Sequence, residues 1–284
     1  MSLVPMRAIL EATEKYNYAQ GAFNVNAVAQ AKAVIEVHEM FRSAAIIQGA
    51  DLANAFMGGR TDFANGTLED KKVGANNIAK AVKQFAENSP IPVALHLDHG
   101  KTIDSCIAAM DGGYTSVMID GSLLPFEENI AVCKKVCEVA HNAADYVSVE
   151  GELGTIGNTD SIETGNNVIK YTVPEDAKTF VEQTGIDALA VAIGTSHGLY
   201  PAGFVPKLRI DILDAIKGMV EVPLVLHGGS SNPDSEIAAA VEHGINKVNI
   251  SSDIKAPFYK KCREVLQNQG LREPNAIYPP CIEV

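Results

Sequence analysis

Residues 222–231 read VPLVLHGGSS, a short apolar run closed by a histidine, and the runs PVALHLDHG (92–100) and ALAVAIGTSHG (188–198) end in the same way. Continuous apolar runs flanked by Gly or Pro are typical of buried parallel strands. The carboxyl ends of parallel strands gather at one mouth of an α/β fold. We therefore expect the histidines that close these three runs to lie close together.

These three histidines are His99, His197 and His227. Three imidazoles leave one coordination position of a tetrahedral zinc ion open, which is the arrangement of a catalytic rather than a structural site. For any one of them alone, a strand-end histidine with an ordinary hydrogen bond is the simpler interpretation. Because the pattern occurs three times, we favour a metal site.

The order of apolar runs predicts the fold class. Eight such runs occur, at 20–25, 43–50, 92–100, 116–122, 146–154, 188–194, 222–229 and 247–252. Helical patterns separate them, at 27–42, 76–88, 126–143 and 235–244 among others. Strands that alternate with helices and have no hairpin turns indicate a closed (β/α)8 TIM barrel. The alternative, an open doubly wound sheet, would show a Gly-rich dinucleotide fingerprint after the first strand, and GAFNVN (21–26) is not one.

The composition of the chain limits the number of domains and the kinds of binding partner that we expect. The 284 residues are 46% hydrophobic and 20% charged, and no linker divides them, so we expect one domain over 1–284. The net charge of −12 argues against nucleic acid or an anionic membrane as a partner. Five cysteines without metal-ligand spacing, no signal peptide and no long apolar run favour a reduced, cytoplasmic setting.

Polar residues at strand ends are the candidate site residues, because barrels carry their chemistry at the carboxyl ends of the strands. This rule collects Asn24, Asp98, His99, Asp120, Glu150, Glu152, His197, His227, Asn249, Ser251 and Ser252. The segments HGGSS (227–231) and NISSD (249–253) also suit a phosphate group, since glycines admit close approach and a helix N-terminus favours an anion. The alternative for each segment alone is a glycine turn and a serine N-cap.

Six segments together resemble the class II, metal-dependent ketose-bisphosphate aldolases, and most closely the branch of tagatose-bisphosphate and short fructose-bisphosphate aldolases. They span the chain in order: LDHG (97–100), MIDGS (118–122), VEGELG (149–154), GTSHGLY (194–200), LHGGSS (226–231) and KVNISSD (247–253). The resemblance implies an enzyme of carbohydrate metabolism such as glycolysis, which cleaves a phosphorylated ketose to dihydroxyacetone phosphate and an aldehyde. It also implies one catalytic Zn²⁺ per subunit and a homodimer or homotetramer.

The resemblance assigns roles residue by residue. It implies zinc ligands at His99, His197 and His227, and a proton-transferring carboxylate at Asp98. Asp120 and Glu152 match acidic residues that can serve an alternative metal position. It further implies a monovalent cation, Na⁺ or K⁺, near Ser196, Gly198 and Gly228. The implied substrate contacts are Asn24, Gly198, Gly228, Gly229, Ser230, Asn249, Ile250, Ser251 and Ser252.

The chain also departs from the family pattern. Where the family has a glutamate that exchanges the carbon-bound proton, this chain has Asp160, with Glu163 nearby. A lysine that often follows the second histidine is missing, so Lys207 or Arg209 is the expected substitute. The C-terminal Pro-Arg that holds a distal phosphate is replaced by Glu-Pro-Asn (273–275). A ketose 1,6-bisphosphate is the expected substrate, and a ketose 1-phosphate with a different distal group remains the alternative.

Three other functions are compatible with the same fold. A Schiff-base aldolase needs a lysine inside the barrel near the carboxyl end of a strand, whereas Lys247 begins its strand and Lys101 lies beyond the third. A zinc-dependent hydrolase is the stronger alternative, because a three-histidine zinc can also activate water. A sugar-phosphate-binding barrel without catalysis would not explain Asp98 beside a predicted ligand. Asp98 and His99 can both face the mouth only if the strand turns there, because successive side chains alternate.

Overall fold

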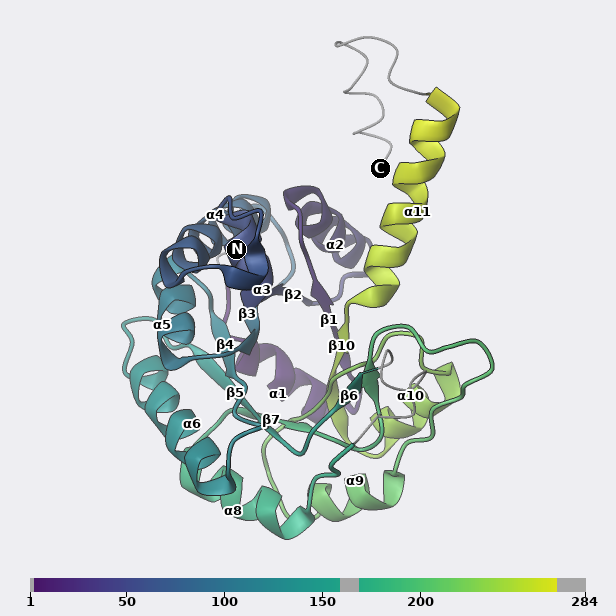
Figure 1. Cartoon of the computed structure of the whole chain (residues 1–284). Helices are drawn as coiled ribbons and strands as arrows, with labels where there is room; N and C mark the ends of the chain where they lie inside the picture. Colours follow the sequence, from purple (N-terminus) through teal and green to yellow (C-terminus); the bar gives the residue numbers. More distant parts are fainter. Residues whose placement is uncertain (1–2, 159–168, 270–284) are drawn as a thin grey trace.

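Eight parallel strands close into a barrel in this computed structural model, which describes residues 3–158 and 169–269. The strands are β1 (Gln20–Asn24), β2 (Ala45–Ala50), β3 (Val93–Gly100), β4 (Ser116–Ile119), β5 (Ser148–Leu153), β7 (Ala188–Val191), β9 (Leu224–Leu226) and β10 (Ile245–Ile250). β1 pairs with both β2 and β10, so the sheet is closed and the open doubly wound alternative is wrong (Figure 1). The predicted (β/α)8 barrel is confirmed.

Helices surround the barrel, as the patterns between the strands predict (Figure 1). They are α2 (Val28–Phe41), α4 (Leu68–Ala86), α5 (Ile103–Gly112), α6 (Phe126–His141), α8 (Pro174–Thr184), α9 (Ile210–Lys217) and α10 (Asp234–Glu242). A short helix α3 (Asp51–Met57) and a 3-10 turn η1 (Phe63–Asn65) come before α4. α4 begins with a capping box, in which Thr67 and Asp70 satisfy each other's backbone N–H groups. None of the described helices is long and apolar enough to span a membrane.

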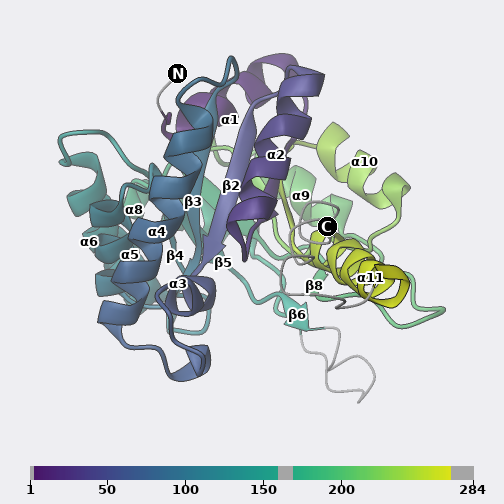
Figure 2. The ribbon, with the colours of Figure 1, turned by 90° about the horizontal axis from the view of Figure 1, so that it is seen from above.

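Helix α1 (Met6–Tyr16) closes one end of the barrel. Its residues Met6, Ile9 and Leu10 are buried against small side chains that line the barrel interior, among them Ala22 and Ala94. Burial of a Leu, Ile or Met side chain contributes about 1.5–3 kcal/mol, so this plug is a substantial part of the core. Figure 2 shows α1 at one end of the barrel and the short strands β6 (Gly157–Asn158) and β8 (Ser196–His197) at the opposite end. The carboxyl ends of the barrel strands form the remaining, open mouth.

The strand that carries His197 differs from the prediction. The sixth barrel strand, β7, already ends at Val191, and Ser196–His197 forms β8, which pairs with β6 in a separate two-stranded sheet. The chain leaves the barrel at Gly194, whose φ of 125° favours glycine. A Cβ there would also lie 2.8 Å from the carbonyl oxygen of Lys207. His197 therefore lies at the mouth on a strap, and not on the barrel wall.

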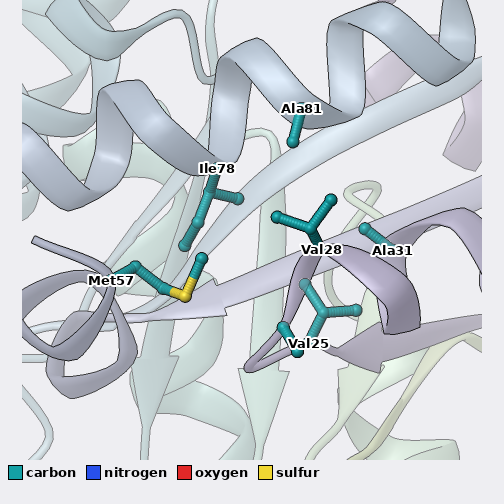
Figure 3. Close-up of a pocket in the computed structure, with 7 residues that line it drawn as sticks. Val25, Val28, Ala31, Met57, Ile78 and Ala81 are labelled. Carbon is teal, nitrogen blue, oxygen red and sulfur yellow. The ribbon is translucent and has the colours of Figure 1, made fainter. Parts of the chain in front are cut away.

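Helix α11 (Ser252–Gln269) follows β10 and extends away from the barrel (Figure 1). A small hollow between α2 and α4 is lined by aliphatic side chains and by Met57 of α3, as Figure 3 shows. No charged or hydrogen-bonding side chain lines this hollow. It is a gap in the packing between α2 and α4 and does not suit a sugar phosphate.

Candidate active site

Three histidines meet at the mouth of the barrel. One ring nitrogen from each of His99, His197 and His227 lies within 4.8 Å of the others. His99 Nε2 and His227 Nδ1 lie 3.1 Å apart. β3, β8 and the end of β9 bring these residues together from positions that are far apart in the sequence, as the three similar runs predict.

The backbone at His99 explains how two successive side chains both face the mouth. His99 has a φ of 51°, in the left-handed region that few non-glycine residues adopt. The pairing of β3 with β4 is also irregular between Leu97 and Gly100. This local turn cancels the alternation of a regular strand, so Asp98 and His99 lie side by side, with Asp98 Oδ1 3.9 Å from His99 Nε2.

Asp98 is buried and is held by two amide side chains. Asn24 Nδ2 donates to one carboxylate oxygen at 2.7 Å, and Asn249 Nδ2 donates to the other at 3.3 Å. Burial alone would raise the pKa of Asp98, but electrostatic interactions with His99, His227 and Lys247 and the Asn24 hydrogen bond hold it well below its usual range. Asp98 is therefore a fixed, ionised carboxylate, as a general base must be before it acts.

Two further carboxylates lie against His99. Asp120 Oδ2 accepts from His99 Nδ1 at 2.9 Å and from Lys101 Nζ at 2.6 Å, and Glu152 Oε2 lies 3.7 Å from the same ring nitrogen. Burial lowers the pKa of His99, but the surrounding carboxylates outweigh it and raise the pKa to about 9. Burial raises the pKa of Glu152. The site thus concentrates negative charge in a largely buried place.

Below the imidazoles lies a layer of charged groups that is fully buried. Glu150 accepts from His227 Nε2 at 2.8 Å and from Lys247 Nζ at 2.9 Å. His96 lies on the side of this pair, with Nε2 3.6 Å from Glu150, and Nδ1 bonded to Ser116 Oγ at 2.7 Å. Burial raises the pKa of Glu150, but Lys247 and the two histidines outweigh this effect and lower it well below its usual range.

Glycines bring the loop after β9 into contact with its neighbours. Gly228 has a φ of 63°, and a Cβ there would lie 2.7 Å from the carbonyl oxygen of Ser196 on β8. A Cβ on Gly229 would lie 2.5 Å from Val248 on β10. Ser230 Oγ accepts from the backbone N–H groups of Ser251 and Asp253, at 3.1 and 3.2 Å. The two predicted phosphate segments are therefore joined, and part of the serine-cap alternative is also correct, because Ser230 caps the start of α11.

The remaining predicted contacts fall at the same end of the barrel. Gly198, with a φ of 116°, follows His197, and Ile250, Ser251 and Ser252 form the junction of β10 and α11. Asp160, Glu163 and residues 273–275 lie outside the described residues. Lys207 and Arg209 were expected to supply a cation at the mouth, but Lys207 pairs with Glu236 at 2.9 Å and Arg209 pairs with Asp211 at 2.6 Å.

The strand ends alone do not reveal what Glu150, Lys247 and Lys101 contact in the site. Glu150 is a strand-end residue without a predicted role, and Lys247 is predicted only to be a poor Schiff-base lysine. Both can be found from alternation, because Glu150 lies two residues before Glu152, and Lys247 two before Asn249, on inward-facing positions. Lys101, which contacts Asp120, carries no local signal of this kind.

The donor set fits a divalent metal ion of intermediate softness. Burial and electrostatic interactions with His99 and His227 lower the pKa of His197 to about 3. Buried Glu152 Oε2 has no hydrogen-bond partner in the part of the chain that the structure describes, and it lies 3.9 Å from His227 Nδ1. An unsatisfied acceptor among imidazole nitrogens suits a cation. Nitrogen and carboxylate ligands suit zinc.

A closed (β/α)8 barrel with a histidine cluster and an ionised aspartate at its mouth defines the class of barrel enzymes that pair a metal site with acid–base chemistry. Within that class, the sequence profile described as "Fructose-bisphosphate aldolase class-II" matches residues 4–284. The chain belongs to the class II fructose-bisphosphate aldolase family. It is therefore an aldolase, a lyase that cleaves a ketose phosphate, and the family's chemistry depends on a metal ion.

Individual relatives agree with this family. A fructose-bisphosphate aldolase of Geobacillus stearothermophilus is 38% identical over 99% of this chain and 90% of its own length. A 6-phospho-5-dehydro-2-deoxy-D-gluconate aldolase of Halalkalibacterium halodurans is 37% identical over 100% of this chain and 92% of its own length. The crystal structure of the YdjI aldolase from Escherichia coli K12 superposes with a TM-score of 0.77 at 31% identity, over 94% of this chain and 88% of that one.

Proposed function

We propose that this chain is a zinc-dependent aldolase that reversibly cleaves a phosphorylated ketose to dihydroxyacetone phosphate and an aldehyde. The single observation that carries the proposal is the convergence of His99, His197 and His227 beside the ionised Asp98. A ketose 1,6-bisphosphate such as fructose or tagatose bisphosphate is the proposed substrate. The second candidate is a ketose 1-phosphate with another distal group, which is favoured by Glu-Pro-Asn at 273–275 and by the ion pairs that occupy Lys207 and Arg209.

The proposed metal position lies between the three imidazoles, with Asp120 and Glu152 as the alternative ligands beside His99. Zinc bound there would act as a Lewis acid that stabilises the negative charge of the enediolate. Asp98 would take the proton from the hydroxyl group on the carbon that becomes the aldehyde. Asn24 and Asn249 hold both oxygens of Asp98, so the base is oriented before substrate arrives. Asp160 is the proposed acid for the enediolate carbon, with Glu163 as the alternative.

The joined loops after β8, β9 and β10 are the proposed site for the ketone-side phosphate. The backbone at Gly198 and Gly228 and the N-terminus of α11 suit an anion, because a helix N-terminus favours negative charge. The Gly229 N–H already donates to the carbonyl oxygen of Asn249 at 2.9 Å. The proposed contacts there are Gly198, Gly228, Gly229, Ser230, Asn249, Ile250, Ser251 and Ser252, with Asn24 across the mouth. A monovalent cation, Na⁺ or K⁺, near Ser196, Gly198 and Gly228 belongs to the same proposal.

The proposed setting is the cytoplasm, and the proposed assembly is a homodimer or homotetramer made of single-domain chains over 1–284. Cys106, Cys133 and Cys137 are buried and Cys262 is partly buried, and all four are free thiols. Burial raises the pKa of the Cys106 thiol above its usual range. Such cysteines act as small core residues and are compatible with a reducing compartment.

Metal removal tests the reaction class. We expect a chelator to abolish aldol cleavage and added zinc to restore it, with fructose and tagatose bisphosphates and the matching ketose 1-phosphates as test substrates. Borohydride with substrate should leave the protein without a lysine adduct, since Lys247 is buried and paired with Glu150. Full activity in excess chelator, or a trapped lysine adduct, would contradict the proposal.

Aldol condensation separates the two ends of the substrate. Dihydroxyacetone phosphate should not be replaceable by dihydroxyacetone, because the joined loops are the proposed binding site for the ketone-side phosphate. Several aldehydes should be accepted if the distal cation is absent. A strict requirement for glyceraldehyde 3-phosphate would instead favour the bisphosphate substrate and exclude the ketose 1-phosphate.

A further inference from the structure

Lys247 and Glu150 form an ion pair inside the barrel that the reaction itself does not use. Lys247 Nζ donates to Glu150 Oε2 at 2.9 Å, and neither side chain has any exposed surface. Removing two charges from water costs several kcal/mol for each ion, and apolar replacement of such a pair is often neutral or stabilising. The stability of the barrel therefore does not explain why charged residues occupy these two positions.

The second oxygen of Glu150 points to the histidine cluster. Glu150 Oε1 lies 2.8 Å from His227 Nε2, which donates its proton, since a carboxylate can only accept. The lone pair of His227 is then on Nδ1, and Nδ1 is the atom that lies 3.1 Å from His99 Nε2. The hydrogen bond from below thus selects the tautomer whose free lone pair faces the proposed metal position.

The other neighbours of Glu150 do not provide this function. His96 Nε2 lies 3.6 Å from Glu150, beyond hydrogen-bond distance, and its Nδ1 is engaged with Ser116. Lys247 is the one cation in hydrogen-bond contact with Glu150 among the described residues. A neutral residue in place of Lys247 would leave Glu150 as a buried carboxylate without its closest positive partner.

We infer that Glu150 and Lys247 are positioning residues of the metal centre, which act through His227. Glu150 holds the His227 ring in the Nε2–H tautomer and in its orientation, and Lys247 holds Glu150 in place as the acceptor. This inference rests on the proposed function, because it requires a metal ion at His227. Loss of such a partner behind a ligating histidine typically lowers metal affinity about 10- to 100-fold.

The test measures zinc affinity by competition with a chromophoric chelator in folded Glu150→Met, Glu150→Gln, Lys247→Met and the double variant Glu150→Met/Lys247→Met. We expect an affinity loss of about 10- to 100-fold in Glu150→Met and in the double variant. We expect a smaller loss in Glu150→Gln, whose amide oxygen still accepts. The double variant leaves no unpaired buried charge, so it should fold even where a single variant does not. Ser116→Ala, which alters the same buried layer without touching His227, is the matched control and should bind zinc like the wild type.

A second readout does not involve metal at all. Nuclear magnetic resonance of metal-free protein with ¹⁵N-labelled histidine should show His227 as the Nε2–H tautomer in the wild type and as a mixture in the double variant. Wild-type zinc affinity in the folded double variant, or an Nδ1–H tautomer in the wild type, would overturn the inference. Unchanged affinity in Lys247→Met would remove Lys247 from it. Failure of the proposed function would look different, since the wild type itself would then bind no zinc.

Discussion

Asp98 and His99 show how one residue's backbone conformation can assemble two functions. The left-handed φ of 51° at His99 places a base and a predicted ligand side by side on one strand end. Strain of this kind typically costs of order 1–3 kcal/mol and is found at functional sites. The carboxylates around His99 raise its pKa, while electrostatic interactions with His99, His227 and Lys247 and the Asn24 hydrogen bond lower the pKa of Asp98. Neighbouring residues in the chain therefore have opposite electrostatic roles.

The first prediction concerns proton transfer by Asp98. Asp98→Asn keeps the size of the side chain and removes its basicity, so kcat should fall roughly 10²- to 10⁴-fold. Zinc content should be unchanged, because Asp98 is not among the proposed ligands. Steady-state kinetics and metal analysis of the same preparation check both parts. Near-normal turnover in a folded, zinc-loaded variant would assign the base elsewhere.

The second prediction concerns pH and His96. Burial lowers the pKa of His96 from 6.5 to about 3, helped by the charge of Lys247. As the pH falls below 6.5, the unfolded chain binds a proton at His96 and the folded chain does not, so acid favours unfolding. His96→Asn removes this group, so the unfolding free energy of the variant should depend less steeply on pH. The slope should fall by up to about 1.4 kcal/mol per pH unit between about pH 5.5 and 4, where the unfolded histidine is protonated and the folded one is not. Urea titrations of metal-free wild type and variant measure it, and equal slopes would show that folded His96 binds the proton.

At the scale of elements, the mouth is held together where β8 crosses the loop after β9. β8 contains only two residues and pairs with the equally short β6, so its own hydrogen bonds give it little stability. Gly228 lets the β9 loop pass within contact distance of Ser196, the residue before His197. The position of His197 therefore depends on packing against a neighbouring loop and not on a barrel strand.

The third prediction uses two glycines with positive φ. A side chain at a left-handed backbone position costs about 1–2 kcal/mol. Gly228→Ala should lower the unfolding free energy by more than this, because its Cβ would also lie 2.7 Å from the Ser196 carbonyl oxygen. Zinc affinity should fall as well, since β8 carries His197. Gly203→Ala is the matched control, because Gly203 has a φ of 84° and a Cβ there would have no atom within 4 Å. Its unfolding free energy should fall only by the cost of the backbone strain. Equal unfolding free energies and zinc affinities for the two variants would contradict this account.

At the scale of the whole molecule, the proposed metal ion connects β3, β8 and the end of β9. A ligand that binds only the folded state raises the unfolding free energy according to its concentration and affinity. The α1 plug closes the other end of the barrel and does not share ligands with this site. Zinc binding at the mouth should therefore raise the unfolding free energy of the whole barrel without any contact with α1.

The fourth prediction is that zinc stabilises the folded protein. At a free zinc concentration of 100 times Kd, the unfolding free energy should increase by about 2.7 kcal/mol, less any binding to the unfolded chain. The urea midpoint should rise without a change in slope. His197→Ala should lose most of this increase, because a three-histidine site cannot replace one ligand. An equal increase in wild type and His197→Ala would remove His197 from the metal site.

The barrel, the order of its strands and the end at which the candidate site lies can be predicted from the residue pattern. Buried parallel strands need continuous apolar runs, and helices between them need a different period, so both are written locally in runs such as 92–100 and 222–229. The histidines that close these runs could be placed at one mouth because parallel strands end on the same side. The residue motifs were also enough to indicate the aldolase family that the comparisons confirm.

The contacts of each of these residues could not be predicted, because they depend on how remote segments pack. Glu150 and Lys247 are 97 residues apart and meet because β5 and β10 face each other across the barrel interior. Remote packing likewise decides the strap that carries His197, the turn at His99 and the Lys207–Glu236 ion pair. The Arg209–Asp211 ion pair is local, because its residues are neighbours in the sequence. Local sequence sets which side of a strand a residue takes, whereas its partners depend on closure of the barrel and on the loops above it.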